Sequence, residues 1–265
     1  MTAAIPLLDA AKILARCAAS ASHVAIEAVS ETGSTNADLL ARLPAGALSR
    51  PVLRIADVQN AGRGRAGRPW LSAPGASLTF SLAWPFKGPL QRLAGLPLAV
   101  GVALAETVAS LDVPVQLKWP NDLMKDGAKL AGILVETGTA PDGVPWAVIG
   151  CGINLAMPDD MEAAIGRAVS SAPWLARMDR NELVALLLSR LAAVLAEFDD
   201  TGFAPFRDRW NALQAWRGQP VNILDQGNVV HQGLAAGVDD AGRLLLDTSA
   251  GRVAVLSGDV SLRLA

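Results

Sequence analysis

The sequence predicts an α+β domain built on a mixed sheet, followed by a small all-β domain. The order of helical periods and strand-like runs before Arg217 is that of an α+β sheet domain. After Gly218, short strands separated by turns have the spacing of a small antiparallel barrel. The composition, 51% hydrophobic and 18% charged with a net charge of -2, is that of a globular chain. We therefore expect domains over residues 1–217 and 218–265.

Each element follows from a local pattern. Helices are predicted over residues 7–19, 34–40, 91–111, 179–198 and 205–214. Strands are predicted over residues 23–30, 51–59, 77–84, 115–119, 130–137 and 146–155, with polar turns at 120–122 and 126–127. Ser34, Thr35 or Asn36 can cap the second helix. The small domain is predicted to hold strands over residues 220–226, 229–240, 242–248, 251–258 and 259–264.

Several classes of protein are excluded by composition. The longest uncharged apolar stretch, residues 93–105, is shorter than the roughly 18–20 residues that cross a bilayer, so no membrane partner is expected. Charged residues interrupt the N-terminal apolar run and no basic region precedes it, which predicts a cytoplasmic protein without a secretory signal. Cys17 and Cys151 stand far apart, which argues against a disulfide framework or structural zinc.

The near-neutral net charge hides a strong asymmetry. No acidic residue occurs between Asp57 and Glu106, whereas that stretch holds five cations. Those cations are Arg63, Arg65, Arg68, Lys87 and Arg92. A local positive field of this kind favours an anionic ligand. Three of the five lysines also fall within residues 118–129.

The glycine-rich loop at residues 62–67 matches G-x-G-x-x-G and follows a predicted strand. A dinucleotide-binding loop would have to open a helix, yet Pro69, Trp70 and a polar stretch follow, and no acidic residue appears about twenty positions later. The interpretation that remains is a flexible loop whose arginines suit phosphate or carboxylate, or simply a solvated basic turn. No P-loop, zinc-protease or serine-hydrolase motif is present, and the histidines, His23 and His231, fall in predicted strands.

Lys129 introduces a strand whose other residues are nearly all apolar. A lysine in this position commonly extends its ammonium to the edge of the strand. The alternative is that the ammonium faces a ligand anion in a partly dry cleft, where the contact is stronger than in water. Position alone leaves both interpretations open.

Taken together, these motifs resemble those of the biotin protein ligase family. The resemblance covers nearly the whole chain from Glu31 onward. It rests on residues 34–36 (STN), 59–68 (QNAGRGRAGR), 118–122 (KWPND), 129–136 (KLAGILVE) and 152–154 (GIN), in the order of the family. Residues 237–239 and 257–263 are similar to the family's small SH3-like C-terminal domain. The implied catalytic fold is a mixed sheet similar to that of class II aminoacyl-tRNA synthetases.

The resemblance implies a two-step reaction. Biotin and MgATP give biotinyl-5'-AMP and pyrophosphate, and a lysine of a biotin carboxyl carrier protein of a carboxylase then attacks the adenylate. Activation of a carboxylate by ATP brings two anions together, so the site needs cations and no histidine. The implied catalytic residues are Lys129, between the biotin carboxylate and the α-phosphate, and Arg65, near the phosphoryl group.

The resemblance also implies binding residues, carried over position by position. Those for biotin are Ser34, Thr35, Asn36, Gln59, Gly62, Arg63, Gly64, Arg65, Lys129 and Gly132. Those for the nucleotide are Arg65, Arg68, Trp70, Asn121, Asp122, Lys129, Asn154 and Trp174. Asp122 is also the candidate magnesium ligand. Trp70 and Trp174 have a plain alternative as packing residues.

Two departures from the family pattern bear on function. Ala66 stands where an arginine is common in the family, which removes one charge; we expect looser or altered retention of the adenylate, with activity preserved. The roughly thirty residues before the first motif are too few for the winged-helix domain that some members carry, so DNA binding is not expected. A homodimer is possible.

Two alternative functions remain open. One is a lipoate or octanoate ligase or transferase on the related fold, and the other is a nonenzymatic module that binds phosphate or nucleic acid.

Overall fold

The computed structural model describes residues 8–265 except 157, 159–161, 164, 166–167 and 259. Its larger sheet has seven strands in the order β1-β2-β3-β7-β6-β5-β4. Their bounds are β1 (Ala25–Thr32), β2 (Val52–Gln59), β3 (Ser77–Pro85), β4 (Gln116–Lys118), β5 (Asp122–Lys125), β6 (Ala128–Thr139) and β7 (Pro145–Asn154). β1 and β2 pair in parallel and every other neighbour is antiparallel, so the predicted mixed sheet is confirmed.

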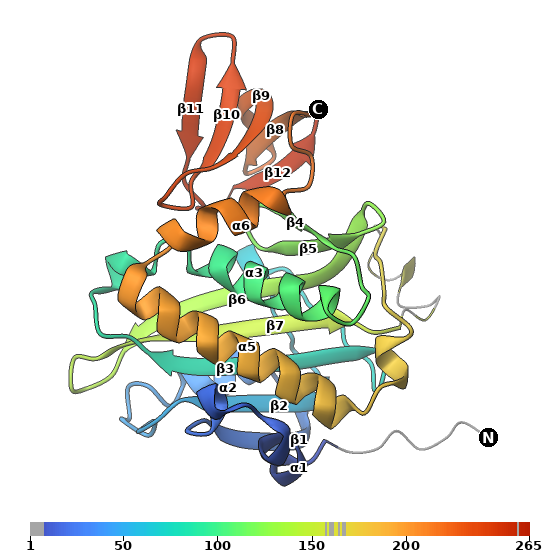
Figure 1. Cartoon of the computed structure of the whole chain (residues 1–265), viewed down its shortest axis with the longest axis vertical. Coiled ribbons are helices and arrows are strands. Elements are labelled where there is room, and N and C mark those ends of the chain that lie inside the picture. The colour runs from blue at the N-terminus through green and yellow to red at the C-terminus, as the bar shows by residue number, and fades with distance from the viewer. Residues whose placement is uncertain (1–7, 157, 159–161, 164, 166–167, 259) are drawn as a thin grey trace.

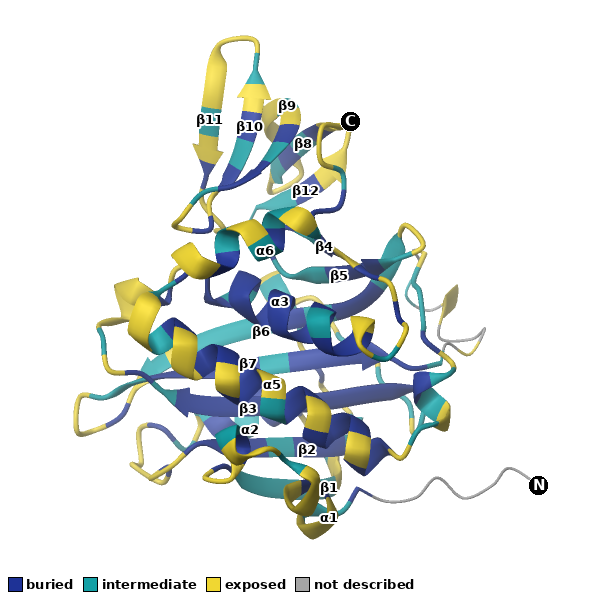
Figure 2. Ribbon diagram, viewed as in Figure 1, coloured by how far each residue is buried: buried dark blue, intermediate teal, exposed yellow. Residues whose placement is uncertain are grey.

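The helices cover the sheet and close the core. They are α1 (Ala10–Arg16), α2 (Thr35–Leu40), α3 (Leu96–Ala109), α5 (Arg180–Thr201) and α6 (Arg207–Ala212). Single turns of 3-10 helix are η1 (Ala19–Ala21), η2 (Arg65–Gly67), η3 (Leu90–Leu93), η4 (Leu175–Arg177) and η5 (Ala204–Phe206). α3 and α5 lie across one face of the sheet (Figure 1). The buried side of α5 faces the sheet and its exposed side faces solvent (Figure 2).

The most apolar helical region is part of the core. Residues Leu90–Ala109 are long and apolar enough to span a membrane by length and composition, but 67% of that stretch is buried within the protein. The predicted continuous helix over 91–111 is interrupted, because Gly95 adopts a left-handed φ of 81° between η3 and α3. A β-carbon on Gly95 would lie 2.7 Å from the Phe203 side chain, so the break also allows close packing.

Two local predictions need correction. β5 begins at Asp122, within the segment expected to be a turn, because Asp122, Leu123 and Met124 pair with β6 across a hairpin. His23 lies in a turn before β1, whereas His231 is in a strand as expected. By contrast, the cap of α2 is confirmed: the Ser34 hydroxyl accepts a hydrogen bond from the Ala37 amide at 3.4 Å.

The C-terminal residues form a separate antiparallel sheet of five strands in the order β11-β10-β9-β8-β12. Its strands are β8 (Pro220–Asp225), β9 (Asn228–Val238), β10 (Leu244–Thr248), β11 (Gly251–Val255) and β12 (Ser261–Leu264). Asp259, which belongs to the tail resemblance, is outside the described residues. The buried Trp119 indole donates a hydrogen bond to the Gly242 carbonyl at 3.2 Å, which ties the small sheet to the end of β4.

Candidate active site

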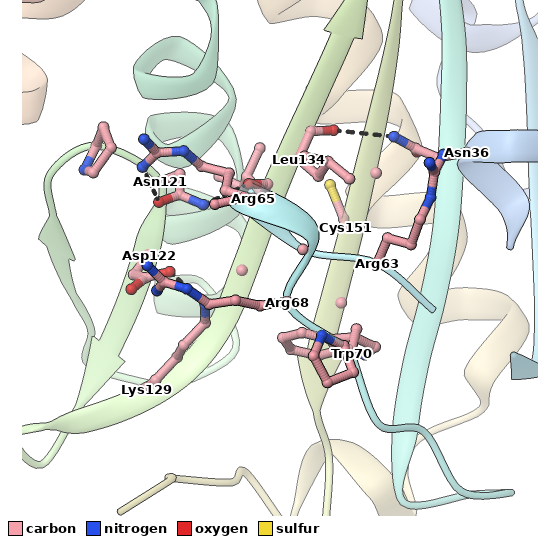
Figure 3. Close-up of a pocket in the computed structure, with 18 of the residues that line it drawn as sticks. Asn36, Arg63, Arg65, Arg68, Trp70, Asn121, Asp122, Lys129, Leu134 and Cys151 are labelled. Atoms are coloured by element: carbon pink, nitrogen blue, oxygen red, sulfur yellow. Dashed lines mark hydrogen bonds and ion pairs between the residues drawn. The ribbon is translucent and has the colours of Figure 1, made fainter. Parts of the chain in front are cut away.

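A cavity lies where the glycine-rich loop crosses the large sheet, between α2 on one side and the β4–β5 turn on the other (Figure 3). The structure brings together in its lining most of the side chains predicted to be functional. These are Ser34, Thr35, Asn36, Gln59, Arg63, Gly64, Arg65, Arg68, Trp70, Asn121, Asp122, Lys129 and Gly132. They come from segments that span residues 34–132, so only the tertiary fold assembles them.

The loop over the cavity is held by its own backbone. The Gly64 amide donates to the Arg68 carbonyl at 2.7 Å, and the Trp70 amide donates to the Gly62 carbonyl at 2.9 Å. At the tip, Ala66 and Gly67 have φ values of 52° and 69°, which reverse the chain direction. A β-carbon on Gly62 would lie 2.5 Å from the Trp70 carbonyl, so glycine is required for this closure. The loop therefore has a defined shape that places its arginines at the cavity.

Glycines on the neighbouring strands let functional side chains lie directly on the sheet. A β-carbon on Gly152 would lie 2.3 Å from Trp70 Cε2, and one on Gly150 would lie 2.5 Å from Asn36 Oδ1. Gly152 pairs with Gly132 across the β6–β7 ladder. These positions form a flat floor beneath the loop, because any larger residue would displace the groups above it.

One end of the cavity is lined by a connected set of neutral polar side chains. Gln59 Oε1 accepts hydrogen bonds from the Thr35 amide at 2.8 Å and from the Thr35 hydroxyl at 3.1 Å. The Thr35 and Ser81 hydroxyls are 2.6 Å apart, and Ser81 donates to Asn36 Oδ1 at 2.5 Å. Thr35, Asn36 and Ser81 are all buried. Connected side chains of this type suit a neutral ligand that both donates and accepts hydrogen bonds.

The opposite end gathers charge around Asp122. Its Oδ1 atom lies 2.5 Å from Lys129 Nζ, and its Oδ2 atom lies 3.6 Å from Lys118 Nζ. The three side chains are between 11% and 17% exposed, so water screens them poorly. Burial lowers the pKa of Lys118 to about 8; the Asp122 charge opposes that shift, whereas Arg263 and Lys129 reinforce it. Two ammonium groups share one carboxylate, which leaves an excess of positive charge for an anion.

Arg65 connects the loop to two other parts of the chain. It donates to Asn121 Oδ1 at 3.2 Å, and Asn121 is oriented by donating its own amide to the Ile133 carbonyl at 2.7 Å. Arg65 also donates to the carbonyls of Gly258 and Val260 in the C-terminal sheet region. The C-terminal residues Val260, Ser261 and Arg263 line the same cavity.

Three predicted residues, all within the described part of the chain, lie outside this lining: Gly62, Asn154 and Trp174. Asn154 lines a second cavity that shares Arg68, Trp70 and Lys129 with the first. The Trp174 ring lies beneath Lys125 Nζ at 5.2 Å and packs against the core.

Sequence reasoning missed several residues of the site. Lys118, Ser81, Gly150 and Arg263 all line the main cavity. Lys118 and Arg263 belong to motifs that carried the resemblance, but nothing local showed that both reach the same cavity. Ser81 and Gly150 carry no signal in the sequence, because each is an ordinary position within a strand.

Comparison with known proteins defines the class first. Residues 29–154 match the biotin/lipoate A/B protein ligase family, and residues 218–263 match the biotin protein ligase C-terminal domain. The chain is 37% identical over 268 residues to the bifunctional ligase/repressor BirA of Escherichia coli, covering 98% of this chain and 79% of that protein. The chain is thus an enzyme of the ligase class.

Further matches narrow the class to one family. The chain is 36% identical over 241 residues to a biotin–[acetyl-CoA-carboxylase] ligase of Mycobacterium tuberculosis, covering 89% of this chain and 88% of that protein. The structure of a biotin protein ligase from Aquifex aeolicus in complex with biotin and ATP matches with a TM-score of 0.74 and 28% identity, covering 92% and 99% of the two chains. The chain belongs to the biotin protein ligase family.

Proposed function

We propose that the cavity activates biotin with ATP to form biotinyl-5'-AMP, and that the enzyme then transfers biotin to a lysine of a biotin carboxyl carrier protein of a carboxylase. The observation that carries this proposal is the pairing of a neutral polar end with a cationic end in one cavity. Biotin has the same two-part character: an uncharged ureido ring at one end and a carboxylate at the other. The names of the relatives support the choice of substrate and acceptor.

The ring would bind at the polar end. Thr35 and Gln59 already form a connected set there, and the groups that they present can exchange partners with the ureido carbonyl and amides. Because an analogue without those groups would leave buried polar atoms unpaired, this end supplies specificity. Gly132, Gly150 and Gly152 let the side chains of Lys129, Asn36 and Trp70 lie close to the sheet along the path from the polar end to the cations.

The first chemical step joins two anions. A carboxylate oxygen of biotin attacks the α-phosphorus of ATP, a phosphorus–oxygen bond forms, and pyrophosphate leaves with its electron pair. Lys129 and Arg65 would offset the negative charge of both reactants and of the transition state. Asp122 orients Lys129, and Lys118 adds a second ammonium group close by. We place the adenine in the neighbouring cavity, which is lined by Trp70 and Asn154.

Magnesium would reach the site with the nucleotide. Within the described residues, no group of three or more His, Cys, Asp or Glu side chains is placed to hold a metal ion. Asp122 is the carboxylate in the cavity, and Mg²⁺ is commonly held by one or two carboxylates together with substrate phosphates and water. We therefore propose that Asp122 supplies a protein ligand to magnesium bound by ATP, where the ion would further offset phosphate charge.

The second step makes an amide. The neutral amine of the carrier lysine attacks the acyl carbon of the adenylate, a carbon–nitrogen bond forms, the acyl–oxygen bond breaks, AMP leaves with its electron pair, and the nitrogen releases one proton to water. We also propose residues 1–217 as the catalytic domain and 218–265 as the small C-terminal domain. Among the residues that the structure describes, the large sheet uses no strand beyond Asn154, and the five-stranded sheet runs from Pro220 to Leu264. A cytoplasmic location, where ATP is available, is part of the same proposal.

The test is ATP–pyrophosphate exchange by the purified protein with biotin, lipoate, octanoate or no acid. We expect exchange that requires biotin and falls roughly 100-fold or more in Lys129→Ala, the size typical for loss of one group that stabilises transition-state charge. Lys87→Ala is the matched control, because that lysine pairs with Asp200 on the surface. Exchange with lipoate alone would move the enzyme to the lipoate branch. If none of the three acids supports exchange, the proposal is overturned.

A further inference from the structure

Glu136 links two parts of the site that no motif connects. It lies in β6, which is adjacent to β7 in the sheet. Its Oε2 atom accepts a hydrogen bond from Asn36 Nδ2 at 2.8 Å. The same oxygen lies 3.5 Å from Nη2 of Arg63, on the glycine-rich loop. In Figure 3, Arg63 and Asn36 lie on the same side of the cavity, away from Lys129 and Asp122.

The contact with Glu136, together with a longer one from Asn36 Nδ2 to the Leu134 carbonyl at 3.5 Å, sets the direction of a chain of hydrogen bonds. An ionised carboxylate only accepts, so the amide nitrogen of Asn36 must face Glu136 and its oxygen must face Ser81. Ser81 then donates its proton to Asn36, which leaves its own oxygen to accept from the Thr35 hydroxyl at 2.6 Å.

Thr35 passes the same order on to Gln59. The single Thr35 hydroxyl proton is shared between the Ser81 oxygen at 2.6 Å and Gln59 Oε1 at 3.1 Å, and the Thr35 backbone amide also donates to Gln59 Oε1 at 2.8 Å. Because Gln59 Oε1 faces Thr35, the Nε2 group of Gln59 faces away from Thr35 and is the group that can donate to a ligand. Asn36, and through it the Ser81 and Thr35 hydroxyls, thus depend on a carboxylate outside the cavity lining, whereas the Thr35 backbone amide orients Gln59.

The contact with Arg63 has a different consequence. Arg63 is 46% exposed and Glu136 is 30% exposed, so the pair is attractive but partly screened by water. Such a pair is too weak to hold the loop permanently. It is strong enough to bias the loop toward the position in which Arg63 lies against the polar end.

We propose that Glu136 is a positioning residue for biotin, which orders the ring-binding side chains through Asn36 and restrains the glycine-rich loop through Arg63. The inference rests on the proposed function, because it assigns the polar end to biotin. It predicts that the two roles separate. Glu136→Gln keeps an oxygen that accepts from Asn36 but loses the charge that attracts Arg63, whereas Glu136→Ala loses both.

The experiment measures biotin-dependent ATP–pyrophosphate exchange for Glu136→Gln, Arg63→Met, their double variant and Glu136→Ala. We expect the first two to raise the KM for biotin about threefold, and the double variant to match either single change. Glu136→Ala should raise it roughly tenfold, the size that loss of a hydrogen bond to a charged group corresponds to. The KM for ATP should stay unchanged in all four, since neither contact is at the cationic end.

A second readout follows the loop directly. With biotin bound, trypsin should cleave after Arg63 and Arg65 faster in Glu136→Gln than in the unaltered protein, because the restraint on the loop is weaker. Glu197→Gln is the control, since this glutamate pairs with Arg209 away from the cavity. Glu136→Gln keeps the side-chain shape, so it stays informative if Glu136→Ala unfolds.

The outcomes separate the two hypotheses. If the unaltered enzyme requires biotin and the Glu136 variants share its KM for biotin, the role of Glu136 is wrong and the proposed function stands. If the KM values for biotin and ATP rise together, Glu136 acts on general stability and the inference is also overturned. If the unaltered protein shows no dependence on biotin, the proposed function fails and this inference fails with it.

Discussion

Gly152→Ala tests whether the glycine floor positions the indole of Trp70. Gly152 is in β7, where it pairs with Thr79 of β3 on one side and Gly132 of β6 on the other. Because both neighbouring strands restrain its backbone, a new methyl group at this position has little freedom to move away. The strain must therefore be relieved by the indole.

The size of the effect follows from the contact distance. A β-carbon on Gly152 would lie 2.3 Å from Trp70 Cε2, whereas carbon atoms pack at about 3.5–4.0 Å. The indole would have to shift by roughly 1 Å, and displacements of that size in an active site cost up to roughly 100-fold in rate. Overpacking should also destabilise the protein by about 1–3 kcal/mol.

The assays are ATP–pyrophosphate exchange, indole fluorescence and denaturant unfolding. We expect lower kcat/KM for ATP and for biotin, because Trp70 borders both cavities. In a Trp70→Ala background, Gly152→Ala should cost little further stability, because the indole that the methyl group would meet is gone, and activity should not recover. Unchanged exchange kinetics together with unchanged fluorescence in Gly152→Ala would refute the reasoning, because the indole would then have tolerated the methyl group in place.

Three further predictions concern other parts of the molecule. Partial burial opposes ionisation of Glu106, but hydrogen bonds from Arg209 and Arg190 and the charges of both arginines outweigh it and hold its pKa below the usual 4.5. A carboxyl with a lowered pKa contributes stability above its unfolded pKa, and this contribution is lost as the pH falls through the folded pKa. Glu106→Gln should therefore unfold more easily in denaturant at pH 7, by about 1 kcal/mol or less, and equal the unaltered protein at strongly acidic pH; a difference that persists in acid would contradict this. Trp119→Phe removes the buried hydrogen bond to the Gly242 carbonyl and should lower the free energy of unfolding by about 1–3 kcal/mol. Denaturant titration measures this change, and an unchanged midpoint would show that the bond does not hold the two sheets together. Ala66→Arg places a cation at the edge of the cavity, in a backbone conformation that alanine already adopts. This change should slow the release of labelled biotinyl-5'-AMP about twofold to fivefold. An equal release rate would show that position 66 does not affect retention of the adenylate.

Much of the local structure could be predicted from the sequence. The alternating apolar residues of 51–59 and 77–84 correspond to β2 and β3, and Asp179 caps α5 at the predicted start. The missed strand, β5, is only four residues long, and its first residue, Asp122, continues the turn-like run that begins at Pro120. Asp122 is in a strand because the hairpin with β6 outweighs that weak local preference.

For the candidate site, the residue types could be predicted from the sequence but their arrangement could not. Its chemistry was readable, since glycine beside arginine in residues 62–68 and a lysine entering an apolar strand are local patterns. Its geometry was not, because the partners of those residues are far away in the chain. Ser81 of β3 reaches Asn36 only because α2 packs against β3 and β7. Arg65 reaches the carbonyl of Val260 only because the C-terminal sheet region lies beside the loop.

The sequence by itself determined the two-part fold class, the boundaries of most strands and helices, and which residue types could meet an anion. These properties depend on neighbouring residues along the chain, through backbone preference and the period of apolar side chains. The tertiary structure alone decided that Lys118 and Lys129 share Asp122, that Glu136 joins Asn36 to Arg63, and that Arg263 enters the cavity. Those contacts depend on strand order and register, which are set by the packing of the whole core.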